Sequence, residues 1–243
     1  MEILITNDDG WGAKGILTLV RILTQLGHVT VVAPDGPRSG MSNAITVQQP
    51  MYLRPLNDPN WGTEEWQQNT PVYTTNGTPS DCVKLALDIL FEGDPSRINL
   101  LASGINHGSN AATASCYSGT LGAAMEGALN GIPAIGVSLD TLHPDADFSG
   151  VAKYFGEIFC KLMKEWPAKH GVYYNVNFPN IPAEDIKGVR VGVQGMGRWV
   201  REFKEWDLQH YAKYGITPEM LGQSSNPVLE EGEDLYMMVG DFT

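Results

Sequence analysis

The sequence predicts an α/β fold: an open, mostly parallel sheet with helices on both faces, followed by a C-terminal extension. Two observations lead to this prediction. Short apolar runs of strand length alternate with longer segments of helical periodicity as far as about residue 186. The first strand, helix and strand also fit within about 33 residues, which is typical of the βαβ unit of a parallel sheet. Because the alternation is sustained, an open doubly wound sheet is the fold class that the sequence favours.

The N-terminal segment supplies the first βαβ unit. Residues 2–6 are an apolar run that stops at residues 7–10 (Asn-Asp-Asp-Gly), which indicates a buried strand followed by a tight turn. Apolar side chains then recur at helical spacing over residues 14–26. A second strand is expected over residues 28–33, before a loop that contains Ser39.

The rest of the core continues this pattern after an interruption. Residues 41–75 are rich in Val, Thr, Gln, Tyr and Pro and are interpreted as an inserted set of short extended segments. Residues 78–81 (Thr-Pro-Ser-Asp) open a helix to about Phe91, because proline suits the first helical turn and small polar residues suit the cap. Further elements are expected as a strand at 98–102, a helix at 118–129, a strand at 133–138, a helix at about 148–166 and a strand at 172–177.

The regular pattern ends at about residue 186. We expect residues 1–186 to form the core and residues 187–243 to form an extension or arm, either in the same domain or at an oligomer interface. Residues 189–193 are predicted to add one more strand. The remainder carries acidic clusters and aromatic residues without clear periodicity. The aromatic residues are Trp199, Trp206, Tyr211 and Tyr214.

The composition excludes several classes of protein. The formal net charge is 16 − 28 = −12, yet only 18% of residues are charged and 42% are apolar, which indicates a folded domain rather than a disordered acidic segment. An acidic chain is also unsuited to sequence-independent binding of nucleic acid. The three widely spaced cysteines form neither a disulfide framework nor a zinc motif. No apolar run reaches the roughly 20 residues of a membrane span, and the N-terminus has no basic region, so we expect a cytoplasmic protein without membrane partners.

Oxygen-bearing side chains follow three of the predicted strands. Asp8 and Asp9 follow the first strand, Ser39 follows the second, and Asn106 lies beyond the strand that ends at Ala102. In an open parallel sheet, ligands bind beyond the carboxyl ends of the strands, near the point where strand order reverses. Adjacent carboxylates repel each other unless a cation is present, and Mg²⁺ and Mn²⁺ accept carboxylate, amide and hydroxyl oxygens. An Asp-Asp-Gly segment alone is more often an ordinary turn, but its coincidence with Ser39 and Asn106 favours a divalent-cation site.

A second group of small residues indicates an anion site. Residues 115–122 (Ser-Cys-Tyr-Ser-Gly-Thr-Leu-Gly) lead into an Ala- and Gly-rich helix, whose first backbone amides are free to face an anion. A well-capped, closely packed helix explains these residues about equally well, and a plain cap is the stronger explanation for residues 77–81. A cation site and a helix N-terminus at one sheet edge together suit a phosphate ester. No Walker, dinucleotide-binding or nucleophile-elbow motif is present, and His107 could reach the site from beside Asn106.

Five segments in order over roughly the first 180 residues carry a more specific pattern. They are residues 3–10 (Ile-Leu-Ile-Thr-Asn-Asp-Asp-Gly) with 14–16, residues 32–39, residues 77–84, residues 103–110 (Ser-Gly-Ile-Asn-His-Gly-Ser-Asn) and residues 117–127. Together they resemble the SurE family of stationary-phase survival proteins, which are 5′-nucleotidases. The combination is far more specific than any one of the segments.

The resemblance implies a Rossmann-like fold and a metal-dependent phosphatase, of the 5′-nucleotidase or acid-phosphatase type, that acts on nucleoside monophosphates. Activity toward 3′-monophosphates and short polyphosphate is a further expectation, as is a homodimer or homotetramer. The resemblance also implies one divalent cation, Mg²⁺ or Mn²⁺, in each subunit. The implied metal ligands are Asp8, Asp9, Ser39 and Asn106. The implied phosphate-pocket residues are Asn110, Ser118, Gly119 and Thr120.

The expected mechanism is metal-assisted hydrolysis of a phosphomonoester, with Asp8 and Asp9 as the catalytic carboxylates. The sequence does not distinguish which of them would act as a general base. A phosphoaspartyl mechanism with Asp8 as nucleophile is an alternative, although the usual Asp-x-Asp spacing is absent. A regulatory module that binds a nucleotide or phosphate without turnover is a second alternative.

The end of the chain departs from the family pattern. Family members close with a strand resembling Tyr-Val-Ser-Ile-Thr-Pro after a long hairpin that is exchanged between subunits. Here the last residues, 239–243, read Val-Gly-Asp-Phe-Thr. The expectation is therefore either an incomplete chain or a variant without the last strand, which affects the exchanged arm but not the site.

Overall fold

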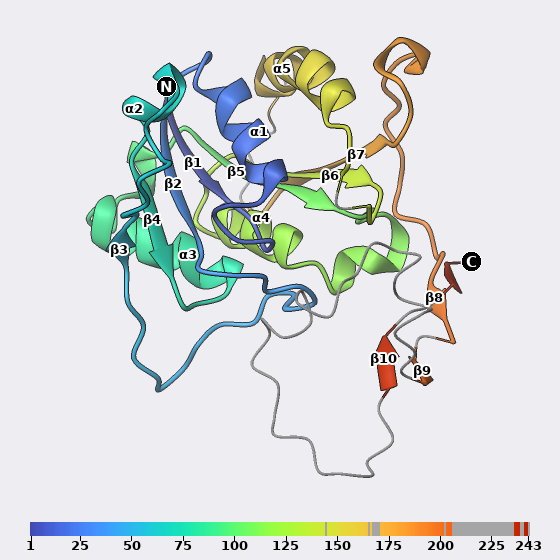
Figure 1. Cartoon of the computed structure of the whole chain (residues 1–243), viewed down its shortest axis with the longest axis horizontal. Helices are drawn as coiled ribbons and strands as arrows, with labels where there is room; N and C mark the ends of the chain where they lie inside the picture. The colour runs from blue at the N-terminus through green and yellow to red at the C-terminus, as the bar shows by residue number, and fades with distance from the viewer. Residues whose placement is uncertain are drawn as a thin grey trace.

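Seven strands form one sheet at the centre of the molecule (Figure 1). The computed structural model describes residues 1–143, 145–164, 166, 171–201, 203–205, 236–238 and 241–242. In the order β3-β4-β2-β1-β5-β6-β7, the sheet contains β1 (Glu2–Thr6), β2 (His28–Pro34), β3 (Arg54–Pro55), β4 (Val72–Thr75), β5 (Leu100–His107), β6 (Ala134–Asp140) and β7 (Tyr173–Pro179). The predicted α/β fold is confirmed.

The strand order reverses at the middle of this sheet. From β1 the chain moves outward through β2 to β4, and it then returns to the other side of β1 and moves outward through β5 and β6 to β7. These neighbours pair in parallel, whereas β3 pairs with β4 antiparallel at the edge. The carboxyl ends of β1 and β5 therefore lie side by side at the reversal point, where open α/β sheets bind their ligands.

Helices cover both faces of the sheet (Figure 1). On one face lie α1 (Lys14–Leu23) and α5 (Ser149–Lys164), and on the other lie α3 (Pro79–Leu85) and α4 (Gly119–Leu129). The shorter helical elements are α2 (Glu65–Gln68), the π-helical turn η1 (Ala86–Leu90), and the 3₁₀ turns η2 (Pro95–Arg97), η3 (Ala112–Cys116) and η4 (Ala183–Asp185).

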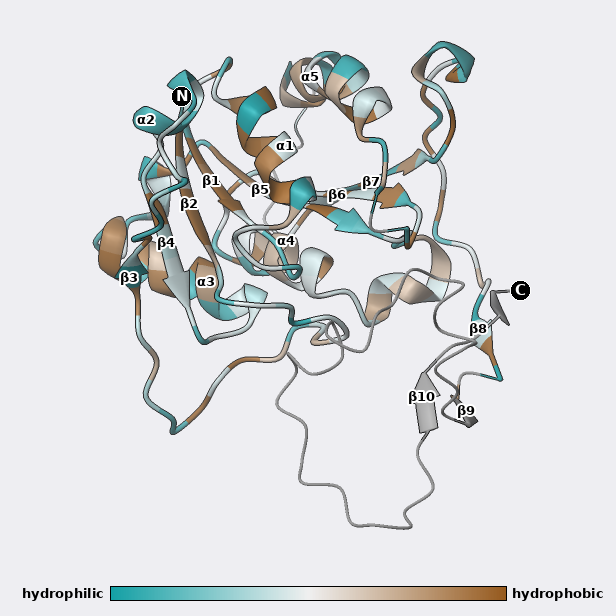
Figure 2. Cartoon of the chain, in the orientation of Figure 1, coloured by the Kyte–Doolittle hydropathy of each residue, from teal (hydrophilic) through white to brown (hydrophobic). Residues whose placement is uncertain are grey.

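Strand β1 shows how one sheet supports two cores. Its side chains alternate, so Ile3 and Ile5 pack on the side of α1 and α5, while Leu4 packs on the side of α3 and α4. All three side chains are fully buried. A strand covered on both faces is apolar without a break, which explains the Ile-Leu-Ile run and the apolar colour of the central strands in Figure 2.

Strand β5 runs further than the strand that was predicted to end at Ala102. Small residues after this position indicated a loop, but the backbone passes an irregularity between Ser103 and Asn106 and then pairs again with β6 at Asn106 and His107. Asn106 therefore lies on β5 at its carboxyl end. The prediction that it lies beyond the strand is wrong, because pairing with β6 outweighs the local preference for a turn.

Part of the segment interpreted as an insertion belongs to the main sheet. Strand β4, at the end of residues 41–75, pairs in parallel with β2. The same segment also contains the short helix α2, whose first turn has a capping box between Glu64 and Gln67. Strands β3 and β4 are extended, as this range was interpreted, whereas residues 65–68 are helical because the capping box starts a helical turn there.

The C-terminal residues that the structure describes form two short antiparallel pairs. Strand β8 (Trp199–Val200) pairs with β11 (Asp241–Phe242), and β9 (Phe203–Glu205) pairs with β10 (Tyr236–Met238). The predicted arm thus includes strands that pair over a long sequence separation. Trp206, Tyr211 and Tyr214 lie outside the described residues.

The strand predicted at residues 189–193 is wrong. These residues lie in no helix or strand. Val191 and Val193 are 94% and 97% exposed. An extended segment becomes a strand only when another backbone pairs with it, and within the described part of the chain these valines have no such neighbour.

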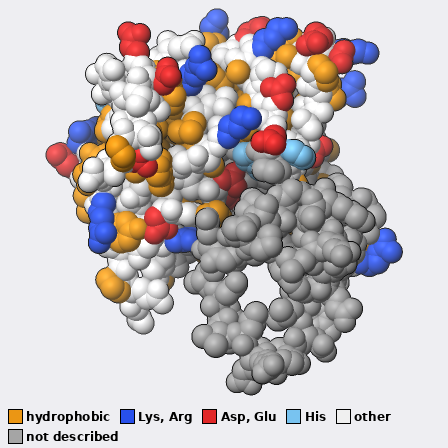
Figure 3. Space-filling model, in the orientation of Figure 1, with side chains coloured by type: hydrophobic (Ala, Val, Ile, Leu, Met, Phe, Trp, Pro, Cys, Tyr) orange, Lys and Arg blue, Asp and Glu red, His pale blue; other side chains and the backbone are white. Residues whose placement is uncertain are grey.

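The surface that the structure describes has mixed charge. On the face shown in Figure 3, acidic and basic side chains are interspersed, and the visible Lys and Arg side chains do not gather into one patch. Among the described residues, no helix combines the length and the apolar character that crossing a membrane requires.

Candidate active site

The turn after β1 places two aspartates at the carboxyl end of the sheet. The Asn7 side chain closes this turn by donating from Nδ2 to the Gly10 carbonyl oxygen at 2.9 Å. Gly10 has a φ of +95°, a left-handed conformation that glycine adopts without strain. This turn is why an Asp-Asp-Gly sequence ends the strand and presents both carboxylates beside the ends of β1 and β5.

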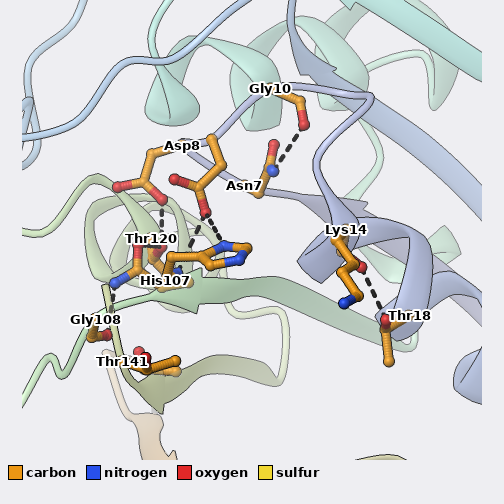
Figure 4. Close-up of polar contacts among 12 residues, drawn as sticks. Asn7, Asp8, Gly10, Lys14, Thr18, His107, Gly108, Thr120 and Thr141 are labelled. Atoms are coloured by element: carbon orange, nitrogen blue, oxygen red, sulfur yellow. Dashed lines mark hydrogen bonds and ion pairs between the residues drawn. The ribbon is translucent and has the colours of Figure 1, made fainter. Parts of the chain in front are cut away.

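Asp8 lies against the first turn of α4. Its side chain is buried, with the residue only 3% exposed. Thr120 Oγ1 donates a hydrogen bond to Asp8 Oδ1 at 2.6 Å, and Figure 4 shows the Asp8 carboxylate directed toward Thr120. At Gly119, an added Cβ would lie 3.0 Å from Asp8 Cβ and 3.1 Å from Oδ2. Glycine at this position therefore allows the helix to begin directly against the carboxylate.

The Asp8 carboxyl has an unusual electrostatic environment. Burial and the adjacent negative charge of Asp9 raise its pKa from 3.8 to about 7, against the opposing effect of the Thr120 hydrogen bond. The protein therefore provides less compensation for the charge of Asp8 than water would. A carboxylate in this condition gains from a bound cation, and a strongly perturbed pKa at a strand end is typical of functional sites.

Asn106 is held at the end of β5 with its amide in a defined orientation. Its Nδ2 donates to the Gly108 carbonyl oxygen at 2.8 Å. Its Oδ1 lies 3.4 Å from Thr120 Oγ1, the same hydroxyl that bonds to Asp8. The structure therefore brings Asp8, Asn106 and Thr120 together at the reversal point, although Asp8 and Thr120 are 112 residues apart in the chain.

Asp9 is positioned by the residue that follows Asn106. The backbone N–H of His107 donates to Asp9 Oδ2 at 3.3 Å, and His107 Nδ1 lies 3.6 Å from the same oxygen. The His107 ring packs edge-on against Phe148, with ring centroids 5.1 Å apart. Figure 4 shows this ring beside the acidic turn. The histidine identified as able to reach the site therefore does so through Asp9.

Ser39 lies on a loop that is anchored on both sides to segments of the site. On one side the Arg38 N–H donates to the Asp8 carbonyl oxygen at 2.7 Å. On the other side the Ser42 N–H donates to the Tyr117 carbonyl oxygen at 3.1 Å, directly before α4. The Ser39 side chain itself is exposed. Within the described part of the chain, no hydrogen bond joins it to Asp8, Asp9 or Asn106.

The predicted phosphate-pocket residues occupy two segments, the start of α4 beside Asp8 and the loop after β5. Ser118 is the N-cap of α4, and its Oγ accepts from the Leu121 N–H at 3.1 Å. Gly119 and Thr120 follow in the first helical turn. Asn110 lies in the loop after β5, and its Nδ2 donates to Ser138 Oγ on β6 at 2.8 Å. Ser138 is the residue paired with Asn106 in the sheet, so Asn110 is tied to the immediate neighbour of a predicted metal ligand.

Two further residues in this region were missed by sequence reasoning. Asn175 and Asn177, on β7, both bond to the backbone of Asn110. The available signal was the Asn-Val-Asn alternation of residues 175–177, which places two amides on one face of a strand. The loop that they contact is about 65 residues away in sequence, and no local pattern indicates it.

The donor set of the site fits a hard divalent cation. Two carboxylates, one amide oxygen and one hydroxyl are oxygen donors of the kind that Mg²⁺ and Mn²⁺ accept. Among the described residues there is no cluster of three or more His, Cys, Asp and Glu side chains, so a site built from nitrogen and sulfur ligands has no counterpart there. The assignment of Asp8, Asp9, Ser39 and Asn106 as ligands stays a prediction.

Comparisons with known proteins point to one family. A sequence model of the family described as "Survival protein SurE" matches residues 3–201. The chain is 42% identical over 220 residues to the 5′-nucleotidase SurE of Bacteroides fragilis, a match that covers 90% of this chain and 81% of that protein. Its identity to the 5′-nucleotidase SurE of Christiangramia forsetii is 39% over 236 residues, or 95% of this chain and 87% of that one.

A solved structure agrees with these matches. The crystal structure of the SurE protein from Aquifex aeolicus is similar with a TM-score of 0.72 at 30% identity. The similarity covers 99% of this chain and 83% of the Aquifex chain.

Proposed function

The chain belongs to the SurE family, as its motifs predicted, and we propose that it is a metal-dependent phosphomonoesterase that hydrolyses nucleoside 5′-monophosphates to nucleoside and phosphate. The relatives named 5′-nucleotidase SurE support the reaction class. The observation that carries the proposal in this chain is the buried Asp8 carboxylate, which lies against the start of α4 and shares the Thr120 hydroxyl with Asn106.

The arrangement separates two tasks at one sheet edge. Asp8, Asp9 and Asn106 present oxygens at the ends of β1 and β5, and Ser39 lies on the loop whose Arg38 N–H bonds to the Asp8 carbonyl oxygen. These residues would hold the cation. The N-terminus of α4 lies directly beside this group, and its first backbone N–H groups have no partner within the helix. Ser118, Gly119 and Thr120, with Asn110, would hold the phosphoryl oxygens there.

The chain's own groups then orient the substrate and take up developing charge. Backbone N–H groups at a helix N-terminus stabilise negative charge on the phosphoryl oxygens as the bond to the leaving oxygen breaks. A divalent cation, when bound, supplies polarisation of the phosphoryl group and lowers the pKa of water at the site. One of the two carboxylates, either Asp8 or Asp9, is available to accept the proton of the attacking water.

The proposal is tested by phosphate release from a panel of 5′- and 3′-nucleoside monophosphates and short polyphosphate. The protein is first treated with a chelator, and Mg²⁺ and Mn²⁺ are then restored separately. We expect no release in the chelator, recovery with at least one metal, and the highest rate with 5′-monophosphates. Activity at the full rate in the chelator would contradict the metal dependence. We propose the 3′-nucleotidase and exopolyphosphatase activities as weaker activities of the same site.

The same preparation also tests the two alternatives to metal-assisted hydrolysis. A rapid quench that traps phosphate covalently on Asp8 would support a phosphoaspartyl mechanism. Saturable nucleotide binding without phosphate release under any metal would support a regulatory module. We expect neither result, because the buried Asp8 is bonded to Thr120 and the site combines a cation-binding group with an anion-binding helix end.

We also propose a homodimer or homotetramer in the cytoplasm. The oligomer is supported by the exposed valines and Met196 in residues 189–196, which leave apolar surface on the described part of the extension. Analytical ultracentrifugation over a range of protein concentrations tests the assembly, and a monomer at every concentration would contradict it. Fractionation of the source cells tests the location.

A further inference from the structure

The last strand of the sheet has two different faces. Tyr174, Val176 and Phe178 pack with the core on the side of α1 and α5. Asn175 and Asn177 alternate with them and therefore point to the side of α3 and α4. Both asparagines are exposed, so the helices on that side do not cover this end of β7. In the sheet, Asn175 and Asn177 pair with Gly136 and Ser138 of β6, so this end of the face carries small and polar residues.

The two amides bind the backbone of Asn110, and Asn177 Oδ1 also accepts a longer hydrogen bond from Ser109 Oγ at 3.4 Å. The Asn110 N–H donates to Asn177 Oδ1 at 2.9 Å, and Asn175 Nδ2 donates to the Asn110 carbonyl oxygen at 2.9 Å. Asn177 Nδ2 donates to Asn175 Oδ1, also at 2.9 Å. The three residues form a closed ring of hydrogen bonds. The side chains of β7 thus hold the backbone of Asn110 through both its donor and its acceptor, as an adjacent strand would.

A third contact fixes the side chain of Asn110. Its Nδ2 donates to Ser138 Oγ, and Ser138 is fully buried on β6. Asn110 itself is only 5% exposed. Its backbone and its side chain are therefore anchored to two different strands, and the residue has little freedom to move away from the carboxyl end of β5.

We propose that Asn175 and Asn177 are positioning residues that hold Asn110 in place for the phosphoryl group of the substrate. The inference rests on the proposed function, since it assumes that Asn110 contributes to the phosphate pocket. The pair touches neither the predicted metal ligands nor the first turn of α4 through any hydrogen bond among the described residues. Its effect should therefore fall mainly on the anion half of the site, because Asn110 reaches the predicted ligand Asn106 only through Ser138, which pairs with it.

The ring also explains why both residues are asparagine. Each amide must donate one hydrogen bond and accept another, which a carboxylate cannot do because it only accepts. An aspartate at position 175 would lose the bond to the Asn110 carbonyl oxygen. An aspartate at position 177 would face Asn175 Oδ1 with an oxygen instead of a donor. Both substitutions would also bring a negative charge toward the phosphate.

The test uses Asn177→Leu, Asn175→Leu and the double variant, which remove the amides with little change in volume. Asn180→Leu is the matched control, because Asn180 is an exposed residue just beyond the same strand and has no hydrogen bond to the described part of the chain. Thermal unfolding first establishes that each variant is folded. Calorimetric titration then measures the affinity for inorganic phosphate with Mn²⁺ present and, separately, the affinity for Mn²⁺ alone.

We expect phosphate affinity to fall about tenfold in either single variant, since each leaves a buried polar group of Asn110 unpaired. KM for a nucleoside 5′-monophosphate should rise by a similar factor while kcat changes by less than about threefold. Mn²⁺ affinity should stay within about twofold of the wild-type value. Because the ring acts as a unit, the phosphate affinity of the double variant should be little lower than that of either single variant. Asn180→Leu should match the wild type.

The results distinguish the ring from the proposed function. Wild-type phosphate affinity in Asn177→Leu, or a parallel loss of Mn²⁺ affinity, overturns the positioning role even if nucleotides are hydrolysed. If the wild type hydrolyses no nucleotide but binds phosphate, and the Leu variants lose that binding, the proposed function fails and the positioning role stands. A wild type that neither binds phosphate nor hydrolyses a nucleotide overturns both.

Discussion

Two buried aspartates in this molecule have opposite electrostatic environments. Asp8, in the turn after β1, is 3% exposed, and Asp81, in the first turn of α3, is 1% exposed. Asp81 accepts hydrogen bonds from the Thr78 N–H at 2.9 Å, from the Thr46 N–H at 3.0 Å and from Thr46 Oγ1 at 2.7 Å. Asp8 instead has a hydrogen bond from Thr120 and a second carboxylate beside it.

The pKa values of the two groups differ in direction for this reason. Burial alone would raise the pKa of the Asp81 carboxyl, but the bonds from Thr46 and Thr78 outweigh it and hold the pKa below its ordinary value. At Asp8, burial and Asp9 prevail and the pKa is raised. Solvent exposure alone therefore does not distinguish the environments of these two carboxylates. The adjacent charge of Asp9 at Asp8 and the hydrogen bonds from Thr46 and Thr78 at Asp81 do.

The largest expected effect is the loss of phosphatase activity on the substitution Asp8→Asn. The amide keeps the shape of the side chain but removes the charge that would bind a cation, so we expect phosphatase activity to fall by at least on the order of a thousandfold. Because the fold does not compensate this charge, the melting temperature should stay the same or rise. Phosphate-release assays and thermal unfolding measure the two quantities. A variant with near wild-type turnover would contradict the role of Asp8.

The next effect in size is expected at Thr120, whose hydroxyl lies between Asp8 and Asn106. Thr120→Val removes the hydroxyl from a fully buried position without changing its shape. We expect activity and metal affinity to fall by about 10- to 100-fold, as for other groups that orient a metal ligand. Thr120→Ser is the matched control and should stay within a few fold of the wild type. Equal losses in both variants would indicate a packing effect and not a positioning one.

The segments around Asp8 also show what the sequence could predict. The apolar run of β1 and the Asp-Asp-Gly turn are local signals, and they suffice to place Asp8 and Asp9 at a strand end. The helix start at Ser118, with Gly119 and Thr120, was equally local, because small polar and glycine residues are typical of helix N-termini. These predictions depended only on residues close together in the chain.

The remaining features depend on contacts between distant segments. The local sequence after Ala102 favours a turn, and only pairing with β6 shows that Asn106 belongs to β5. The environments of Asp8 and Asp81 likewise depend on Thr120 and Thr46, which are 112 and 35 residues away. Asn175 and Asn177 were missed for the same reason. Sequence patterns predicted which residues carry chemistry, whereas the structure shows that the fold leaves the charge of Asp8 without compensation.

The next expected effect is on stability, and it is larger for Asp81 than for Asp8. Asp81→Ala removes the acceptor for Thr78 and Thr46 at the start of α3, so we expect a loss of roughly 2 kcal/mol in the free energy of unfolding. Activity of the folded protein should change by less than about tenfold. Asp94→Ala is a suitable control, because the Asp94 side chain also accepts a backbone hydrogen bond at a helical start, as the N-cap of the short turn η2, but is exposed, and its effect should be much smaller. Urea unfolding measures both, and equal losses would contradict the argument from burial.

The smallest expected effect is the pH dependence of stability, and its sign differs between the two sites. The stabilisation from Asp81, whose folded-state pKa is lowered, is present above its unfolded pKa near 4 and is lost as the pH falls through the folded value. The penalty from Asp8, whose folded-state pKa is raised, is absent below about pH 4 and complete above about pH 7. Urea unfolding in a chelator at a series of pH values measures the difference between the wild type and each Asn variant.

The two difference curves should therefore slope in opposite directions. The advantage of the wild type over Asp81→Asn should grow as the pH rises toward the unfolded pKa near 4 and then stay constant. Relative to Asp8→Asn, the wild type should lose stability as the pH rises from about 4 to 7. Added Mn²⁺ should remove the second loss, because a cation bound to the ionised carboxylates stabilises the folded state alone. Curves of the same slope would show that the two aspartates differ in position only, and that the charge of Asp8 is compensated within the fold.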